Sequence, residues 1–585
     1  MLAQRLALVA LVALAGCKKH AADTKSDKPR GDKGNESYRT DTTGYHTDPA
    51  VVGSGKTFLV VSEGPLASKV GRDMLAAGGN AVDAAVATAF ALAVVHPTAG
   101  NLAGGGFAVV HVAKDQDATL DFREVAPGAA TETMFLDAAG KPTKASTIGD
   151  RAVGVPGTVA GLYALHQKYG KKPWKDVIAP AIAFARDGFA VDAYLHKAIE
   201  YKKDLLAASP ASAALWLPGG KPREVGEVVK LPELQAALER IADKGADGFY
   251  TGPTAQAIVD EMTRGGGLIT AKDLAGYKPD WRDPLTFDYR GRHVVTMPPP
   301  SSGGVVLEMT ANMLRTVDLG KLGWHSAEHL HWLIEVWRRA FAARNELLGD
   351  PAYVKDMPLA KLTSQAYADQ LASSIQPTKA TPSKTIPGLI EGNHTTNLCV
   401  VDASGMAVAM TVTLNTAFGN GVTVDGFLLN DEMDDFTSKP GEPNTYALRQ
   451  GAPNKIEPGK RMLSSMTPTL LEDDQGQVVM VVGAGGGPRI ITAVWQTISN
   501  VVDFGLAVDA AVAAPRIHHQ HLPDSVRVEG EAITREVDKK LRTMGYIMDF
   551  SQTPREFGAV TAIVRTQNGW QGAADPRGGG AAIGD

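Results

Sequence analysis

Cysteine is almost absent from this sequence, which has only Cys17 and Cys399 among its 585 residues. Two cysteines exclude a disulfide framework and a cysteine-rich zinc site. An excess of one charge is also lacking, because 59 basic residues stand against 64 acidic ones, for a formal net charge of -5. A nucleic-acid-binding protein would show a basic excess or a basic stripe, so no nucleic-acid partner is expected.

Long hydrophobic runs are missing as well. The run Leu6–Leu14 has nine residues, whereas a membrane-spanning helix needs about 20. Hydrophobic residues make up 44% and charged residues 21%, which is typical of a globular protein. The length exceeds what one hydrophobic core usually spans, so we expect two or more cores or a large composite domain.

The N-terminus has the pattern of a targeting segment over residues 1–16. Arg5 precedes the apolar run, as in a secretory signal. Residues 14–17, Leu-Ala-Gly-Cys, resemble the lipobox of bacterial lipoproteins, in which cleavage leaves a lipid-bearing cysteine at the new N-terminus. The alternative is a plain secretory signal with a chance cysteine. The lipobox predicts an exported protein anchored through Cys17 to a bacterial membrane, in the periplasm or cell envelope.

Residues 17–50 are rich in polar side chains and have few large apolar ones. Such a segment cannot bury enough surface to fold alone, so we interpret it as a flexible tether that begins at the lipidated Cys17. The folded body is predicted to begin at residue 51.

The body is helical in pattern up to about residue 393 and rich in strands after it. Asn80 is expected to cap a helix over 81–95 that is apolar nearly all round, as a helix buried inside a large protein would be. Strand pairs with helices over them predict a layered α/β sandwich. Further helices are predicted at 156–170, 174–187, 232–243, 253–264, from 305, 325–347 and 489–503, and strand pairs at 395–402 with 406–413, 467–472 with 478–482, and 560–565 with 570–574.

Three other patterns resemble ligand-binding motifs. Gly53–Thr57 looks like the end of a phosphate-binding loop, but Ala50 stands where that motif needs glycine, and a first strand at 57–61 is the simpler interpretation. His325 and His329 have the spacing of zinc ligands on a helix, but the residue pattern between them is wrong, and helix-start histidines are usually solvated or capping. The second histidine group is disfavoured as a zinc site because its adjacent pair would face opposite sides of a strand; it comprises His518, His519 and His521. No metal and no cofactor is therefore expected.

Thr395 opens a predicted strand. A threonine hydroxyl is a poor nucleophile at neutral pH, but it can act if its own α-amine is free to serve as the base. That would require the chain to be cut between His394 and Thr395. The pair Thr395-Thr396 by itself is commonplace at the start of a strand.

Several short segments, in order and spacing, resemble the γ-glutamyltransferases of the N-terminal-nucleophile hydrolase superfamily, over about residues 57–577. The resemblance implies an αββα sandwich (α/β, or α+β) built from a large subunit, 51–394, and a small catalytic subunit, 395–585, of one autocleaved precursor. The matching segments are 104–107, 121–124, 298–304, 395–396, 413–416, 430–436, 464–466 and 483–489.

The resemblance also implies roles for individual residues. Thr395 would cut the precursor and then serve as the nucleophile, with Thr413 orienting it. The backbone N–H groups of Gly486 and Gly487 would form the oxyanion hole, since glycine lets two N–H groups converge on one oxygen. The substrate's α-carboxylate would be held by Arg123, Ser464 and Ser465, and its α-ammonium by Asn415, Glu432 and Asp435.

The chain departs from the family pattern near the oxyanion hole. Gly485 stands where bacterial relatives often have proline, and Pro488 where they often have serine; Glu432 replaces the glutamine of some relatives. Cys399, in the same strand as the nucleophile, is expected to be a small buried core residue and not a second nucleophile. Residues 437–463 match the lid of family members, in which the equivalent of Tyr446 covers the site.

The implied activity is transfer of a γ-glutamyl group from glutathione and other γ-glutamyl compounds to water, or to amino acid or peptide acceptors. A lid favours such a small substrate over a bulky β-lactam. Three alternatives are weighed: a cephalosporin or glutaryl acylase of the same fold, an inactive lipoprotein that only binds γ-glutamyl compounds, and a structural lipoprotein of the cell surface. The balance of hydrolysis and transpeptidation, acceptor specificity, the membrane involved and assembly beyond two subunits stay open.

Overall fold

The computed structural model describes residues 49–383, 395–530 and 532–585. The predicted signal segment 1–16, Cys17, nearly all of the predicted tether, and His394 therefore lie outside the described residues. In the described parts of the chain, no helix is both long and apolar enough to cross a membrane.

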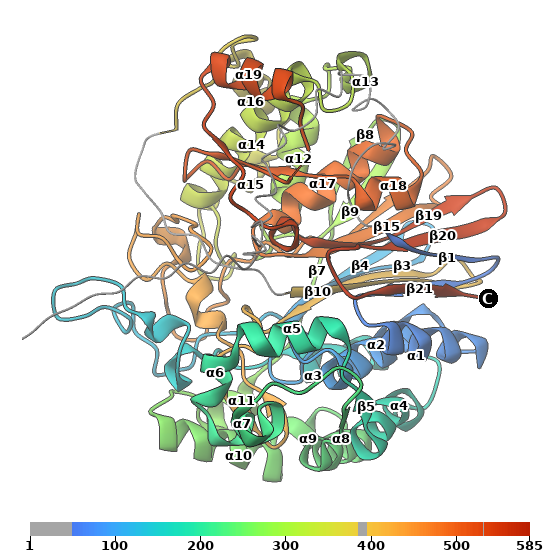
Figure 1. Ribbon diagram of the computed structural model, residues 1–585, viewed down its shortest axis with the longest axis vertical. Helices are drawn as coiled ribbons and strands as arrows, with labels where there is room; N and C mark the ends of the chain where they lie inside the picture. The colour runs from blue at the N-terminus through green and yellow to red at the C-terminus, as the bar shows by residue number, and fades with distance from the viewer. Residues whose placement is uncertain (1–48, 384–394, 531) are drawn as a thin grey trace, which may run out of the picture.

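Two antiparallel sheets of seven strands each form the centre of the molecule (Figure 1). The first sheet runs in the order β1 (Val51–Gly55), β20 (Gly569–Ala574), β19 (Ala559–Thr566), β15 (Val478–Gly485), β14 (Thr469–Glu472), β9 (Arg292–Thr296) and β8 (Leu285–Tyr289). The second runs in the order β21 (Ala581–Gly584), β2 (Leu59–Ser62), β10 (Thr395–Val401), β11 (Ala407–Thr413), β3 (Gly105–Ala113), β4 (Gln116–Asp121) and β7 (Asp280–Arg282).

Helices cover the outer face of each sheet, giving four layers (Figure 1). Over the first sheet lie α12 (Gly303–Met313), α13 (Leu319–Leu322), α14 (Ala327–Leu347), α15 (Leu359–Leu362), α16 (Gln365–Ser373), α17 (Arg489–Val502), α18 (Val508–Ala513) and α19 (Arg535–Met544). Over the second lie α1 (Pro65–Ala76), α2 (Ala81–Val95), α3 (Thr158–Tyr169), α4 (Trp174–Asp187), α5 (Ala193–Tyr201), α6 (Lys203–Ala207), α7 (Pro210–Trp216), α8 (Pro232–Lys244), α9 (Asp247–Tyr250), α10 (Gly252–Gly265) and α11 (Ala271–Gly276). The predicted αββα sandwich is confirmed.

Side chains alternate along the central strands and thereby feed two separate cores. On β10, Leu398 and Val400 pack with the helices of the second sheet, whereas Cys399 and Val401 face the first sheet. The second core includes α2, whose residues are all buried except Val95. As predicted, the Asn80 side chain caps this helix by accepting the N–H of Asp83 at 2.9 Å.

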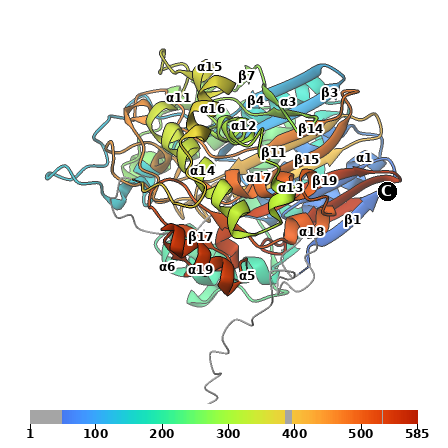
Figure 2. The ribbon, with the colours of Figure 1, turned by 90° about the horizontal axis from the view of Figure 1, so that it is seen from above.

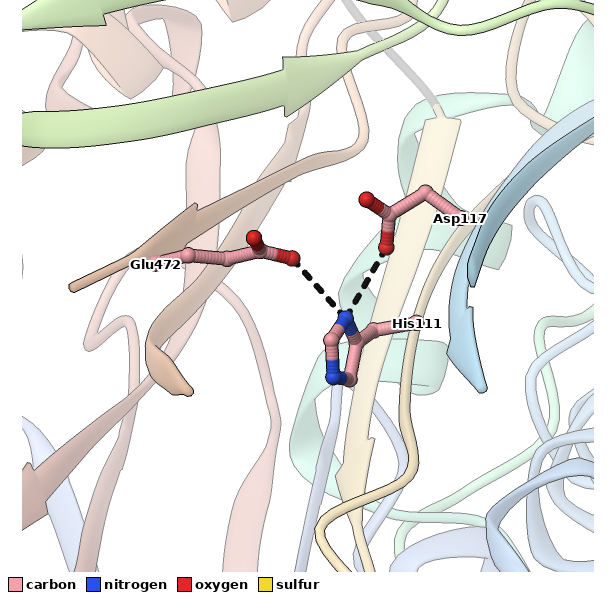
Figure 3. Close-up of side chains that lie close together, drawn as sticks. All are labelled: His111, Asp117 and Glu472. Carbon is pink, nitrogen blue, oxygen red and sulfur yellow. Dashed lines mark hydrogen bonds and ion pairs between the residues drawn. The ribbon is translucent and has the colours of Figure 1, made fainter. Parts of the chain in front are cut away.

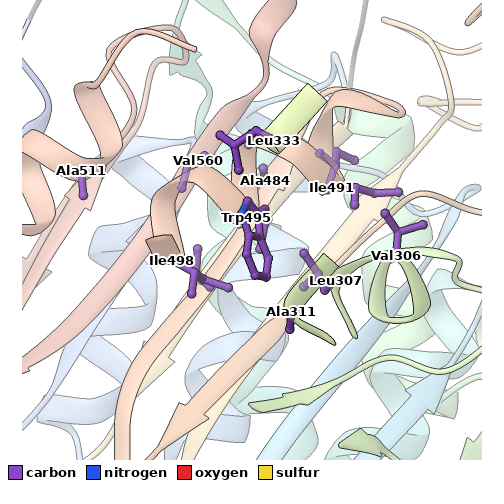
Figure 4. Packing of buried hydrophobic residues seen from close by; sticks show 14 of the residues in the cluster. Val306, Leu307, Ala311, Leu333, Ala484, Ile491, Trp495, Ile498, Ala511 and Val560 are labelled. Atoms are coloured by element: carbon purple, nitrogen blue, oxygen red, sulfur yellow. The ribbon is translucent and has the colours of Figure 1, made fainter. Parts of the chain in front are cut away.

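The first sheet packs against α12, α14 and α17, which lie over it in the view of Figure 2. Trp495 of α17 is 1% exposed and lies close to Leu307 of α12 (Figure 4). The helix predicted at 325–347 corresponds to α14, in which Trp337 and Phe341 are fully buried. This packing fixes α17, whose first residue, Arg489, is separated from the predicted oxyanion glycines by Pro488 alone.

Strands from both sides of position 394 alternate within both sheets. In the second sheet, β10 and β11 lie between β2 and β3, and in the first sheet β20, β19, β15 and β14 lie between β1 and β9. The predicted pieces 51–394 and 395–585 therefore share each sheet and each core, so cutting the chain between them would leave one body held by strand pairing.

The segment that resembled a phosphate-binding loop is a strand end. Residues 51–55 form β1 and pair antiparallel with β20, with Gly53 opposite Gly572. The predicted first strand at 57–61 is displaced: β2 begins at Leu59 and ends at Ser62.

Candidate active site

Thr395 is the first residue of β10, and its strand partner is Thr413, the last residue of β11. Their hydroxyl oxygens lie 3.3 Å apart, and both residues are buried. The Thr413 hydroxyl also accepts the N–H of Asn415 at 2.8 Å. The sequence predicted this hairpin, and its register places the two hydroxyls together at the end of the sandwich.

A glycine turn lies beside Thr395, where β15 ends and α17 begins. Gly486 has φ 138° and Gly487 has φ 57°, backbone conformations that a side chain would strain. A Cβ at Gly485 would stand 1.8 Å from the carbonyl oxygen of Thr395. Gly485 therefore permits close approach of β15 to β10 at Thr395, which a side chain at position 485 would hinder.

The turn also places the N-terminus of α17 at the site. Arg489 is the first residue of this helix, after Pro488. The N–H groups of Arg489 and Ile490 already bond to the carbonyls of Gly486 and Gly487, so the helix favours negative charge there through the positive end of its dipole. The arrangement can stabilise an oxyanion formed near Gly486 and Gly487.

Arg123 lies just after β4, and it is fully buried. Its guanidinium forms ion pairs with both Glu432 and Asp435, which lie on one short 3₁₀ turn. The resemblance assigned Arg123 to one end of an amino acid and the two acids to the other. In this structure the opposite charges pair with each other, so an amino acid ligand would have to exchange partners with them.

Burial shifts the proton affinity of this cluster. Burial raises the pKa of Glu432 well above its ordinary value, and the attraction of Arg123 opposes the rise without cancelling it. The pKa of Asp435 is raised for the same reason. Burial also raises the pKa of the neighbouring Glu124 to about 7, against the attraction of Arg123. A cationic group entering the site would favour the ionised forms.

Ser464 and Ser465 are held beside Arg123 by the Pro-rich loop before α12. Ser302 in that loop donates both its N–H, at 2.8 Å, and its hydroxyl, at 2.6 Å, to the carbonyl of Ser464. Ser465 accepts a hydrogen bond at 3.3 Å from Arg344 of α14. The loop thus fixes the backbone at Ser464, and both serines line the same cavity as Arg123.

Tyr446, the predicted lid residue, covers the site. It is 4% exposed. Its hydroxyl donates to the carbonyl of Asn415 at 2.7 Å, and its own carbonyl accepts from Gln520 at 3.1 Å. These bonds hold the lid segment closed over the cavity.

Ten of the eleven residues predicted for nucleophile, oxyanion hole, substrate and lid line one cavity of about 20 Å³. Gly486 faces a neighbouring cavity instead, which Thr395 also lines. The ten are Arg123, Thr395, Thr413, Asn415, Glu432, Asp435, Tyr446, Ser464, Ser465 and Gly487.

Two site residues were missed by sequence reasoning. Arg344 contacts Ser465, and its only signal was a charged residue on a helix face otherwise made of core side chains. Glu63 follows β2 and accepts the N–H of Asn397 at 3.2 Å. It is 4% exposed, and burial raises its pKa well above the ordinary value. Nothing in the local sequence distinguished Glu63 from a surface carboxylate.

Cys399 is buried, as predicted. Its Sγ lies 3.4 Å from the carbonyl oxygen of Thr561, and burial raises the pKa of the thiol to about 12. The thiol is therefore neutral at pH 7, which is unsuited to a nucleophile.

The expectation that His325 and His329 are solvated or capping is wrong. Both are buried, and burial lowers the pKa of His325 to about 4. The Nδ1 of His329 accepts the N–H of His325 at 3.0 Å, and the Nδ1 of His325 lies 2.7 Å from the carbonyl oxygen of Ala532. These contacts are those of core histidines, because the Nδ1 atoms of both rings already have protein partners, whereas Nε2 of His329 is buried without one.

Among the described residues, the group whose geometry could hold a metal ion is His111, Asp117 and Glu472 (Figure 3). The His111 Nδ1 lies 2.9 Å from Asp117 on β4 and 2.8 Å from Glu472 on β14. Burial acts to lower the pKa of His111, but hydrogen bonds and charges from the two acids outweigh it and raise the pKa to about 9. The His111 imidazole binds the two acids and thereby joins the two sheets.

Comparison with known proteins gave consistent matches. The family model described as Gamma-glutamyltranspeptidase matches residues 67–585. The glutathione hydrolase proenzyme of Pseudomonas sp. (strain A14) is 45% identical over 537 residues, which is 89% of this chain and 92% of that protein. The glutathione hydrolase proenzyme of Escherichia coli (strain K12) is 44% identical over 531 residues, which is 89% of this chain and 90% of that protein. Among solved structures, a cephalosporin acylase from Bacillus halodurans superposes with a TM-score of 0.80 at 27% identity, over 93% of this chain and 98% of that one.

Proposed function

This chain belongs to the γ-glutamyltranspeptidase family, and from that premise we propose that it is a γ-glutamyl acyltransferase with Thr395 as its nucleophile. Its substrates are glutathione and related γ-glutamyl compounds, and the acceptor is water, an amino acid or a peptide. The observation that carries the proposal is the shared cavity, in which Thr395 and Thr413 stand beside groups of opposite charge suited to both ends of an amino acid.

Maturation precedes catalysis in this proposal. The Thr395 hydroxyl attacks the carbonyl carbon of residue 394, the peptide C–N bond breaks as an ester bond forms, and the hydroxyl proton passes to the released amine. Water then hydrolyses the ester, which leaves a carboxylate on the large subunit and both a hydroxyl and an α-amine on Thr395. The free amine serves as the base in later cycles.

In the catalytic cycle, the Thr395 oxygen attacks the γ-amide carbonyl of the substrate. The N–H groups of Gly486 and Gly487, at the N-terminus of α17, stabilise the oxyanion. The C–N bond breaks, the leaving amine takes up the proton, and the γ-glutamyl group remains as an ester on Thr395. Water or an acceptor amine then attacks the ester and restores the hydroxyl.

Substrate recognition proceeds by exchange of ion pairs. The α-carboxylate of the γ-glutamyl group replaces Glu432 and Asp435 as the partner of Arg123, and Ser464 and Ser465 supply hydroxyl donors. The α-ammonium takes the two released acids as its partners. Exchange limits the desolvation cost, because each buried charge keeps an opposite charge beside it.

The second candidate is an acylase acting on glutaryl or cephalosporin side chains, favoured by the TM-score of 0.80 to the Bacillus halodurans cephalosporin acylase. Against it, Tyr446 is hydrogen-bonded over the cavity, which disfavours a bulky acyl group. The rates on γ-glutamyl-p-nitroanilide and on glutaryl-cephalosporanic acid separate the two activities.

The test is a denaturing gel of the purified protein beside its Thr395→Ala variant, with N-terminal sequencing of the smaller band. We expect a small fragment beginning Thr-Thr-Asn-Leu in the wild type and one full-length band in the variant. A single full-length band in both samples, with measurable binding of glutathione, would instead support the inactive binding lipoprotein.

We further propose export and membrane anchoring. Support comes from the apolar run and the Leu-Ala-Gly-Cys sequence at residues 14–17. Mass spectrometry of the N-terminal peptide tests this: a diacylated or triacylated Cys17 is expected, and an unmodified Cys17 in an exported protein would favour the plain secretory signal.

A further inference from the structure

Three side chains of the types that bind metal ions meet between the two sheets. His111 of β3 lies opposite Asp117 of β4 in the second sheet, and Glu472 is the last residue of β14 in the first (Figure 3). The Nδ1 atom of His111 and one oxygen of each acid all lie within 4.8 Å of one another. One imidazole and two carboxylates from three strands thus converge on one point.

This cluster lies far from the candidate active site. In the ladder between β3 and β11, Gly105 faces Thr413, whereas His111 faces Ala407. The six residues from Gly105 to His111 span about 20 Å of an extended strand. A ligand bound at His111 would therefore act on the fold and would not touch the reacting bond.

The cluster is short of positive charge. Within the described parts of the chain, His111 is the one ion-pair partner of both Asp117 and Glu472. A single imidazolium offsets one of the two carboxylate charges. The side chain of Glu472 is 6% exposed and that of Asp117 is 12% exposed, so little water is left to solvate the remaining negative charge.

One proton on the ring nitrogen also cannot serve both acids. The His111 Nδ1 forms a hydrogen bond of 2.9 Å with Oδ1 of Asp117. Oε1 of Glu472 lies 2.8 Å from the same nitrogen, yet among the described residues this buried oxygen has no hydrogen-bond partner. A buried acceptor without a donor is destabilising. A cation held by all three atoms would satisfy this oxygen and balance the charge.

We propose that His111, Asp117 and Glu472 form a structural binding site for one divalent cation, with Zn²⁺ as the best fit. Zn²⁺ takes imidazole nitrogen and carboxylate oxygen ligands, and a water molecule on the partly exposed side of Asp117 completes a tetrahedral set. The cation takes the place of the Nδ1 proton, which leaves to the solvent. Two positive charges then balance the two carboxylates.

The geometry asks for a small adjustment. Tetrahedral bonds of about 2.0–2.1 Å place neighbouring ligand atoms roughly 3.3 Å apart. The present separations from Nδ1 are 2.9 Å to Asp117 and 2.8 Å to Glu472. Side-chain rotations that widen each separation by about 0.5 Å would admit the metal.

The site would join the two predicted subunits. His111 and Asp117 belong to the piece 51–394, and Glu472 belongs to the piece 395–585. After cleavage no peptide bond connects these pieces, so the cation would cross-link them where the sheets face each other. This inference does not depend on the proposed function, because it concerns how the body is held together.

The test is a calorimetric titration of Zn²⁺ into mature, untagged protein that has been treated with EDTA, at pH 7.5. We expect one Zn²⁺ to bind per chain in the wild type and to raise the midpoint of thermal unfolding. Glu472→Gln should weaken this binding at least about 100-fold, since loss of even an outer partner of a metal ligand costs about 10–100-fold. Asp117→Asn, at a partly exposed position, should do the same and replaces Glu472→Gln should that variant not fold.

Asp288→Asn is the matched control. Asp288 is an exposed acid that lies 3.0 Å from His293, so the change removes a histidine–aspartate contact that lacks a third ligand. This variant should bind Zn²⁺ as the wild type does. Zinc X-ray absorption of the loaded wild type should show nitrogen and oxygen ligands and no sulfur. Wild-type protein that takes up no Zn²⁺, or equal uptake by the wild type and Glu472→Gln, would overturn the site.

Discussion

Thr395 and Thr413 are directly opposed in the β10–β11 ladder, and their hydroxyl oxygens lie 3.3 Å apart. Thr413 also accepts the N–H of Asn415, so one hydroxyl contacts both Thr395 and Asn415. One strand pairing thus links Thr395, the proposed nucleophile, to a residue of the proposed substrate cavity.

Replacing Thr413 by valine should slow both autocleavage and turnover by about tenfold to a hundredfold, because losing a buried hydrogen-bond partner costs about 1–3 kcal/mol. Gel densitometry of the precursor over time and kcat on γ-glutamyl-p-nitroanilide measure the two effects. Thr411→Val is the control: Thr411 lies on β11 like Thr413, bonds to Asn397 of β10 and lies outside the active-site cavity. Rates within twofold of wild type in Thr413→Val would contradict the orienting role, and Thr413→Ser should restore most of both rates.

Replacing Gly487 by alanine should lower kcat by about 10² to 10³, the usual effect of disturbing an oxyanion-hole donor. With φ 57°, an alanine here would shift the backbone and turn the N–H away. Gly505→Ala is the control, since Gly505 has φ 65° with open space around it. The control should lose stability but keep kcat; equal kcat losses in both variants would point to general destabilisation.

Binding of L-glutamate to the Thr395→Ala variant should release protons at neutral pH. Burial raises the pKa values of Glu432 and Asp435 in the empty site, and a bound α-ammonium favours their ionised forms. Affinity should therefore increase as pH rises through these raised pKa values. Calorimetric titration in two buffers of different ionisation enthalpy measures the released protons.

Glu432→Gln should reduce that proton release, because the amide has no proton to lose. Glu346→Gln, at an exposed position of α14, should leave it unchanged. Equal heats in both buffers for the protein with Glu432 intact would show that the acids are already ionised and would contradict the prediction.

His111→Gln should destabilise the protein more at pH 6 than at pH 9.5. The folded-state pKa of His111 is raised to about 9, above the unfolded value of about 6.5. Its stabilising contribution is thus complete below about pH 6.5 and is lost as pH rises through about 9. Hydrogen bonds to charged groups suggest a loss of about 1.5–3 kcal/mol at pH 6.

Urea unfolding of His111→Gln in the uncleaved Thr395→Ala background measures this loss on a single chain. His293→Gln removes an exposed histidine beside Asp288, and a surface pair of this kind contributes about 0–1 kcal/mol. A destabilisation by His111→Gln that is the same at both pH values would show that the ion triad between the sheets does not depend on the His111 charge.

The elements near the site illustrate what the sequence could predict. The hairpin at 395–413 and the helix after residue 488 followed from strand alternation, a Ser-Gly turn and apolar periodicity, all of which are local signals. The burial of His325 and His329 did not follow, because it depends on packing between α14 and the segment around Ala532. Arg344 and Glu63 gave no local signal for the same reason.

The sequence by itself determined the family resemblance, the order of strands and helices, the nucleophile candidate and both charged ends of the substrate site, because short motifs and periodicity are encoded locally. Only the tertiary structure decided how those charges meet. Arg123 pairs with Glu432 and Asp435 across more than 300 positions of the chain. Such contacts are set by how two sheets stack and which helices cover them, and no local pattern records that geometry.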